Sequence, residues 1–235
     1  MGSAPAVLVM VALALLAGCG GHPSGHPDPG AAVARASAPA MPCQSQWEDG
    51  LFLTCLRTAL DDVWSREFSA TGRTYTSAAL AVGPVVVPTG EHAPDFTRDR
   101  AYFSGNSGIH FPTKYLDDVR AAHGPRAHSV LTFTLGHETG HHVQQLLHTL
   151  FRGSDVDVET QADCYAGFWA RREADQGSLD IGEFRSGARA ELRRLSEDPD
   201  EVHSHGNADR RIASLDTGLA ATDPAACDTG RMTWR

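Results

Sequence analysis

The feature that most constrains this chain is a pair of histidines, four positions apart, inside a long helical pattern. Residues 127–151 carry apolar side chains on all sides of that pattern, which predicts a largely buried helix. The sequence HETGH occupies residues 137–141 within it. His137 and His141 would lie about one turn apart on one face, so both imidazoles can reach a single metal ion. Buried polar side chains need partners, and a metal ion provides them.

Glu138 is rotated about 100° around the helix from His137, so it points beside the metal rather than at it. From there it can hold and deprotonate a water at the metal, which is the role of this residue in HExxH enzymes. The alternative is that the three polar residues lie on a solvated helix face. The apolar residues around them count against it: Leu131, Phe133, Leu135, Val143, Leu146 and Leu147. The pattern therefore predicts Zn²⁺ held by His137 and His141, with Glu138 as the catalytic base.

A catalytic zinc ion takes three protein ligands and one open position, so the site needs a third ligand. The metzincin spacing would place Gly and His three and six residues after His141, but this chain has Gln144 and Leu147 there. His148 lies on the same face as His141, yet two turns away at about 10 Å, which is too far to share the ion. The metzincin class is thereby excluded.

Residues 155–172 predict a second helix, on which Glu159 and Asp163 share a face because they are four positions apart. In this respect the chain resembles the gluzincins, in which an ExxxD helix completes the zinc site. The resemblance implies that Glu159 is the third zinc ligand and that Asp163 holds the other ring nitrogen of His137, fixing its tautomer. The alternative is an acidic helix face that is simply solvated.

Three sequence blocks carry a closer resemblance: LGHETGHHVQ, VETQADCYAGFWARR and an HG-x-x-x-x-R segment that begins at His205. Over about residues 47–229 the chain is similar to the bacterial neutral zinc metallopeptidase family of exported, gluzincin-like proteins. The resemblance implies a zincin-like domain that binds Zn²⁺ and cleaves peptides. It also makes His205 a candidate donor to the developing oxyanion. The alternative for His205 is to cap a helix or to bond a backbone carbonyl.

The remaining patterns predict short strands followed mostly by helices, which indicates an α+β domain, mainly helical with a small antiparallel sheet or hairpin. Apolar, β-branched residues predict one or two strands at 75–88 and a hairpin over 101–111. Helical periodicity or helix signals mark the other elements: 45–70, 112–122 (a short helix or turn), 178–198 and 207–219.

The N-terminal residues 6–17 form an unbroken apolar run, about 18 Å long as a helix and too short for a bilayer core of roughly 30 Å. The run is typical of a signal peptide and ends in LAGC, which resembles a bacterial lipobox with Cys19 as the lipidated residue. We therefore expect a lipoprotein signal peptide (1–18), a disordered tether rich in Gly, Pro, Ala and Ser (19–42) and a zinc metallopeptidase-like domain (43–235). An ordinary signal peptide with a chance cysteine is the alternative.

Four cysteines follow Cys19, an even number that predicts two disulfides in an exported domain. Three pairings are possible for Cys43, Cys55, Cys164 and Cys227. Because the first two are near each other in the sequence, Cys43–Cys55 with Cys164–Cys227 is the preferred pairing. The expected location is the outer face of the bacterial cell membrane, with the lipid on Cys19 as anchor.

Charge argues against one class of partner. The chain has 20 Lys and Arg against 29 Asp and Glu, a net charge of −9, whereas nucleic-acid-binding proteins present a basic face. We therefore expect a peptide or protein substrate and no nucleic acid. Two other functions stay open: a non-catalytic zinc-binding envelope lipoprotein acting as scaffold or partner, and a zinc amide hydrolase acting on cell-wall material. Glu138 counts against the first, because a structural zinc site needs no base.

Overall fold

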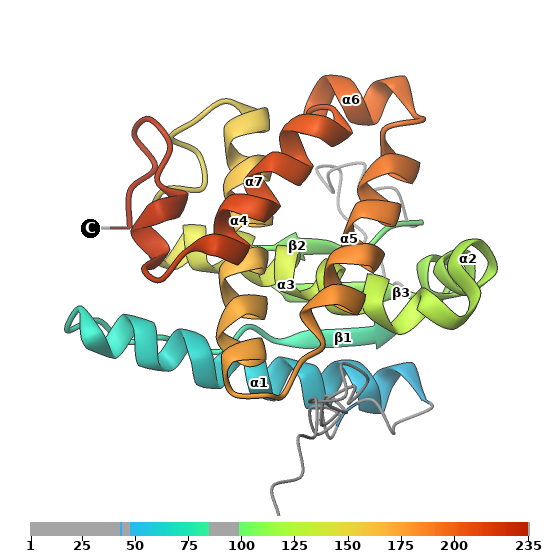
Figure 1. Cartoon of the computed structure of the whole chain (residues 1–235), viewed down its shortest axis with the longest axis horizontal. Helices are drawn as coiled ribbons and strands as arrows, with labels where there is room; N and C mark the ends of the chain where they lie inside the picture. The colour runs from blue at the N-terminus through green and yellow to red at the C-terminus, as the bar shows by residue number, and fades with distance from the viewer. Residues whose placement is uncertain (1–42, 44–47, 85–98, 235) are drawn as a thin grey trace, which may run out of the picture. The chain divides into compact units, whose positions relative to one another are not determined.

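The computed structural model describes residue 43, residues 48–84 and residues 99–234 (Figure 1). The expected signal peptide, the lipidated Cys19 and the tether lie outside the described residues. The helices and strands below belong to one compact unit, residues 37–235. Among the described helices, none is both long and apolar enough to span a bilayer.

Two helices, α3 (Ala127–Leu146) and α4 (Asp155–Asp175), pack against each other at the centre, with α7 (Ala208–Ala220) on the other side of α4 (Figure 1). Every residue from 131 to 140 in α3 is buried, which follows from the apolar side chains around that helix. α5 (Ile181–Leu195) packs on α3, and α1 (Asp49–Ala70) contacts both α3 and α4.

Glycines allow these helices to approach closely. A Cβ atom at Gly140 of α3 would lie 2.8 Å from the carbonyl oxygen of Ala162 on α4. A Cβ atom at Gly218 of α7 would lie only 1.9 Å from the carbonyl oxygen of Cys164, also on α4. The backbone of α4 therefore contacts the backbone of a neighbouring helix on each side. Any residue other than glycine at these two positions would prevent that contact.

In the described part of the chain the sheet has three strands, β1 (Leu80–Gly83), β2 (Tyr102–Ser104) and β3 (Gly108–Pro112), in the order β1-β3-β2. β2 and β3 form the predicted antiparallel hairpin, but β1 pairs with β3 in parallel. The expectation of an antiparallel sheet is therefore wrong, and the sheet is mixed. A local pattern identifies a strand but not its distant partner, and here β1 pairs with the second strand of the hairpin. The end of the predicted 75–88 strand lies outside the described residues.

The predicted helices are present with shifted ends, and a short helix between α5 and α7 was not predicted. α2 spans Thr113–His123, and α6 (Pro199–His205) falls between α5 and α7. Asn207 is the N-cap of α7, because its side-chain oxygen accepts a hydrogen bond from the backbone N–H of Arg210 (2.9 Å). The helix predicted over 127–151 ends at Leu146, and His148 has a φ of 57°, so its expected place on the helix face is wrong.

Both disulfides have the preferred pairing, Cys43–Cys55 and Cys164–Cys227. The second joins α4 to the 3₁₀ turn Pro224–Cys227 near the C-terminus. The indole of Trp234 is buried and packs against Trp64 and Tyr165. The C-terminal residues are thus part of the core. The zincin-like part of the fold prediction is tested by none of these features and stays a prediction.

Candidate metal centre

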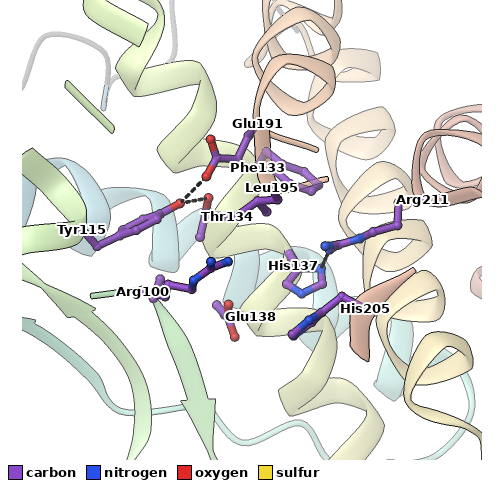
Figure 2. A pocket seen from close by; sticks show the side chains of 11 residues that line it. Arg100, Tyr115, Phe133, Thr134, His137, Glu138, Glu191, Leu195, His205 and Arg211 are labelled. Atoms are coloured by element: carbon purple, nitrogen blue, oxygen red, sulfur yellow. Dashed lines mark hydrogen bonds between the residues drawn. The ribbon is translucent and has the colours of Figure 1, made fainter. Parts of the chain in front are cut away.

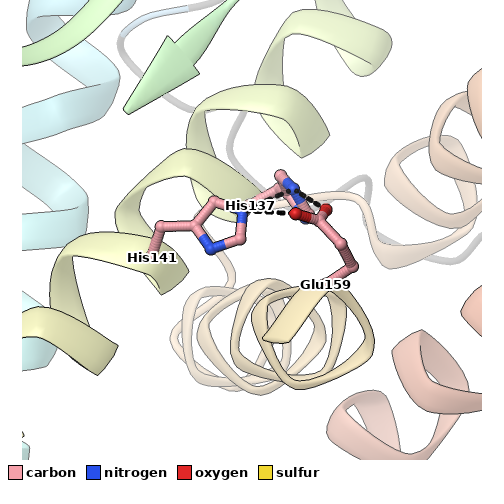
Figure 3. A group of neighbouring side chains, drawn as sticks. All are labelled: His137, His141 and Glu159. Atoms are coloured by element: carbon pink, nitrogen blue, oxygen red, sulfur yellow. Dashed lines mark hydrogen bonds and ion pairs between the residues drawn. The ribbon is translucent and has the colours of Figure 1, made fainter. Parts of the chain in front are cut away.

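Three potential ligands meet where α3 faces α4 (Figure 3). α3 presents His137 and His141, and their Nε2 atoms are 3.1 Å apart. α4 presents Glu159, whose Oε2 lies 3.1 Å from Nε2 of His137 and whose Oε1 lies 3.4 Å from Nε2 of His141. One turn separates the histidines on α3, as the spacing predicts, and the close approach at Gly140 brings the carboxylate of α4 to them.

The hydrogen bonds on the far side of each ring show what this group can bind. Nδ1 of His137 donates to Oδ1 of Asp163, and Nδ1 of His141 donates to Oε1 of Gln144, both at 2.9 Å. When the imidazoles are neutral, their protons are therefore on Nδ1, and two Nε2 lone pairs face the Glu159 carboxylate. Oε2 of Glu159 is buried without a hydrogen-bond partner. Three converging acceptors require a cation, and a His₂Glu donor set suits Zn²⁺.

The protonation equilibria of the metal-free group indicate the same demand for positive charge. Burial lowers the pKa of His137, but Asp163 and Glu159 outweigh burial and raise that pKa to about 10. Burial raises the pKa of Glu159, yet His141 and His137 hold it well below its ordinary value. Without a metal, protons supply the positive charge that the carboxylates favour. A metal ion must displace those protons to bind.

Asp163 is held by a residue to which the sequence analysis assigned no role. Arg211 of α7 donates from Nε to Oδ2 of Asp163 (2.7 Å) and from Nη2 to Oδ1 (2.9 Å). Both side chains are buried, at 3% and 0% exposure for Arg211 and Asp163. Burial raises the pKa of Asp163, but Arg211 and His137 lower it overall, so it stays ionised. The one available signal was the final Arg of the HG-x-x-x-x-R segment.

A cavity of about 80 Å³ opens beside the metal-binding group and is lined by His137, Glu138 and His205 (Figure 2). Glu138 is buried, at 7% exposure, and faces this cavity next to His137. His205 reaches it from the end of α6, with a third of its side chain exposed and Nε2 3.9 Å from Oε1 of Glu159. His203, two residues earlier, is exposed and does not line the cavity. The structure thus brings Glu138 and His205 to one space beside the ligands.

Gly206 explains how His205 reaches that space. Its φ of 89° ends α6 in a conformation that favours glycine, and a Cβ atom there would lie 2.9 Å from Cγ1 of Val156. The HG segment therefore packs directly on the first turns of α4, which carries Glu159. This contact places the His205 side chain at the mouth of the cavity.

Comparison with known proteins gives an independent result. The chain matches the family described as "Putative neutral zinc metallopeptidase" over residues 5–230. It is 25% identical over 206 residues to the uncharacterized protein YpfJ of Escherichia coli K12, covering 77% of this chain and 71% of that protein. It is 28% identical over 183 residues to the uncharacterized protein Rv2575 of Mycobacterium tuberculosis H37Rv, covering 65% of this chain and 56% of that protein. No solved structure matches the chain.

The family match covers nearly the whole chain, and it includes the helices that carry His137, His141 and Glu159. The description of the family names zinc, and the geometry places three zinc-type ligand atoms within 4.8 Å of one another. On these grounds the chain belongs to the putative neutral zinc metallopeptidase family.

Proposed function

We propose that this protein is a zinc metallopeptidase that hydrolyses peptide bonds. The observation that carries the proposal is the position of Glu138, buried beside two histidines and a carboxylate that converge on one point, at the wall of an open cavity. His137, His141 and Glu159 would hold the ion. When bound, zinc polarises a substrate carbonyl and lowers the pKa of water to about 7.

The chain's own residues perform the proton transfers. Glu138 accepts a proton from the attacking water and then delivers it to the leaving amine, so one carboxylate acts as base and then as acid. The ring of His205, at the mouth of the same cavity, donates a hydrogen bond to the developing oxyanion. Asp163 and Arg211 do not touch the substrate in this scheme; they hold the ring of His137 in the tautomer that leaves Nε2 for the metal.

The non-catalytic alternative is less compatible with the geometry. A structural zinc site usually fills all four positions with protein ligands. Among the residues that the structure describes, the group contains three such ligands, and a cavity opens beside them. A buried Glu138 next to the group has no structural purpose in a closed site. Cell-wall amides would use the same residues, so that alternative becomes an outcome of the test.

We also propose that the protein is exported and anchored by a lipid on Cys19. The LAGC sequence after an apolar run supports the anchor. The two disulfides support export, because disulfides persist in oxidising compartments outside the cytoplasm.

The test combines metal content with digestion of a mixed peptide library, comparing the wild type with Glu138→Gln. The variant should keep one zinc ion per chain and lose cleavage by at least about a hundredfold, because general-base catalysis contributes at least that much. The matched control is Glu197→Gln, which changes an exposed glutamate and should cleave like the wild type. Cleavage retained by the Glu138 variant would refute the assignment. Hydrolysis of cell-wall fragments but not peptides would favour the amide hydrolase.

A further inference from the structure

Two buried glutamines connect the metal-binding group to the C-terminal segment, defined here as residues 227–232. Gln144 on α3 and Gln161 on α4 are 0% and 1% exposed. Nε2 of Gln144 donates to Oε1 of Gln161 at 3.1 Å, and Oε1 of Gln144 accepts from Nδ1 of His141 at 2.9 Å. An unbroken series of hydrogen bonds therefore runs from the predicted ligand His141 through both amides.

The direction of every bond in this series is determined at its C-terminal end. Nε2 of Gln161 lies 2.9 Å from the carbonyl oxygen of Met232 and 3.1 Å from that of Cys227, and a carbonyl can only accept. The amide nitrogen of Gln161 must therefore face these carbonyls, which turns its oxygen toward Gln144. Gln144 in turn must present its nitrogen there, where it also donates to the carbonyl of Val158 (2.7 Å).

The same constraint extends to the metal ligand His141. With its nitrogen committed to two acceptors, Gln144 has only its oxygen to offer His141. His141 must respond with a proton on Nδ1, which leaves the Nε2 lone pair facing Glu159. Reversing either amide would place two acceptors or two donors against each other at both ends, at a cost of about 1–3 kcal/mol for each buried unsatisfied group.

The two carbonyls at the start of the series are themselves held in place. Cys164, the residue after Asp163 on α4, forms a disulfide with Cys227 and so attaches that residue to the helix. Thr229 and Met232 exchange two backbone hydrogen bonds, of 2.8 and 3.0 Å. The side chain of Met232 is fully buried and packs against Gly153, in the loop before α4. A Cβ atom at Gly153 would lie 2.6 Å from the sulfur of Met232, so only glycine leaves space for it. The C-terminal segment is thus a rigid base for the amides.

We propose that Gln144 and Gln161 are positioning residues through which the C-terminal segment fixes the tautomer of His141 for zinc binding. Asp163 and Arg211 fix the tautomer of His137 in the same way, so separate parts of the chain orient the two histidines. The inference rests on the metal site of the proposed function but not on peptide cleavage, so loss of one does not remove the other.

The test uses the full zinc-loaded chain and two measurements that need no activity. Competition with a chelator gives the zinc Kd, and ¹⁵N NMR of the histidine rings reports the Nδ1–H proton of His141. Gln161→Leu, which does not touch His141, leaves the carbonyl of Val158 as the remaining acceptor for the Gln144 amide. It should raise the zinc Kd by about tenfold and speed the exchange of that Nδ1 proton with water. Thr160→Val is the matched control: it changes a buried neighbour on α4 that bonds within its own helix, and should leave both readings unchanged.

A second variant separates this relay from general stability. In Gln144→Leu His141 loses its Nδ1 partner, so a change at Gln161 can no longer reach the ring through residue 144. In that background Gln161→Leu should change the zinc Kd by less than about threefold. An equal effect in both backgrounds, or none in the wild type, overturns the proposal. If Gln161→Leu does not fold, Gln161→Met, which is closer to glutamine in shape, takes its place; a zinc Kd equal to that of the wild type then overturns the proposal.

The outcomes distinguish this inference from the proposed function. Zinc binding with the expected coupling, but without cleavage of any peptide, supports the relay and refutes the peptidase. Cleavage with wild-type zinc affinity in Gln161→Leu refutes the relay alone. If the wild type binds no zinc at all, both proposals fail together.

Discussion

Removal of the Arg211 guanidinium should destabilise the protein even without metal. Arg211 and Asp163 are almost fully buried, and two charge-assisted hydrogen bonds of 2.7 and 2.9 Å join them. In Arg211→Met a buried carboxylate loses the stronger of its partners and retains only His137. Breaking one side of a buried ion pair costs about 3–5 kcal/mol, most of it from the charge left behind.

The assay is urea unfolding of the metal-free protein in chelator, followed by circular dichroism. With a slope near 2 kcal/mol per molar urea, the loss would lower the midpoint by about 1.5–2.5 M at an unchanged slope. The matched control is Arg189→Met. Arg189 pairs with Asp216 at 2.5 Å, but a third of each side chain is exposed, so its removal should cost less than about 1 kcal/mol.

A double variant tests the cause of the loss. Adding Asp163→Asn to Arg211→Met removes the stranded charge, while the amide oxygen still accepts from His137. The double variant should therefore be more stable than Arg211→Met alone by at least about 1 kcal/mol. If Arg211→Met loses no more than the Arg189 control, or the double variant is weaker than the single, the burial argument is wrong.

Two further predictions concern pH and localisation. Burial raises the pKa of the Glu191 carboxyl, but hydrogen bonds and charge from Arg194 and His123 lower that pKa overall. The ionised carboxylate therefore stabilises the fold fully above the ordinary pKa of 4.5. This stabilisation is lost as the pH falls through the lower pKa of the folded state. Glu191→Gln should therefore cost about 1–3 kcal/mol at pH 7 in thermal or urea unfolding, and the gap from the wild type should shrink in acid; a gap independent of pH contradicts this. If Cys19 is lipidated, cells fed labelled fatty acid should label the wild type but not Cys19→Ala, and the variant should leave the membrane fraction; equal labelling rules out that anchor.

The parts of the site that lie within one helix could be predicted from sequence, because helical periodicity converts spacing directly into a shared face. His137 and His141 follow from that rule alone. Glu159 and Asp163 also share a face by spacing, but their partnership with α3 came from a resemblance to gluzincins. The geometry now shows a physical basis for it at Gly140, where the two backbones touch.

What the sequence did not reveal depends on partners far along the chain. Arg211 is 48 residues from Asp163, and Gln161 is 71 from Met232, so no local period relates them. The parallel pairing of β1 with β3 has the same origin, because alternation identifies a strand without naming its neighbour. The disulfide pairing could be predicted because four cysteines leave three pairings, and Cys43 and Cys55 are near each other in the sequence.

Gly140 shows why the position between Glu138 and the second histidine is part of the metal geometry. A Cβ atom there would lie 2.8 Å from the carbonyl oxygen of Ala162, against at least 3.4 Å in ordinary contact, so α4 would have to move by about 0.6 Å (3.4 minus 2.8). Glu159 is three residues before Ala162 on the same helix and would move with it. Metal sites tolerate about 0.2 Å in ligand distance. A methyl group added at Gly140 would therefore displace Glu159 by three times the distance that the site tolerates. On the other side of α4, the backbone contact at Gly218 prevents the helix from moving away.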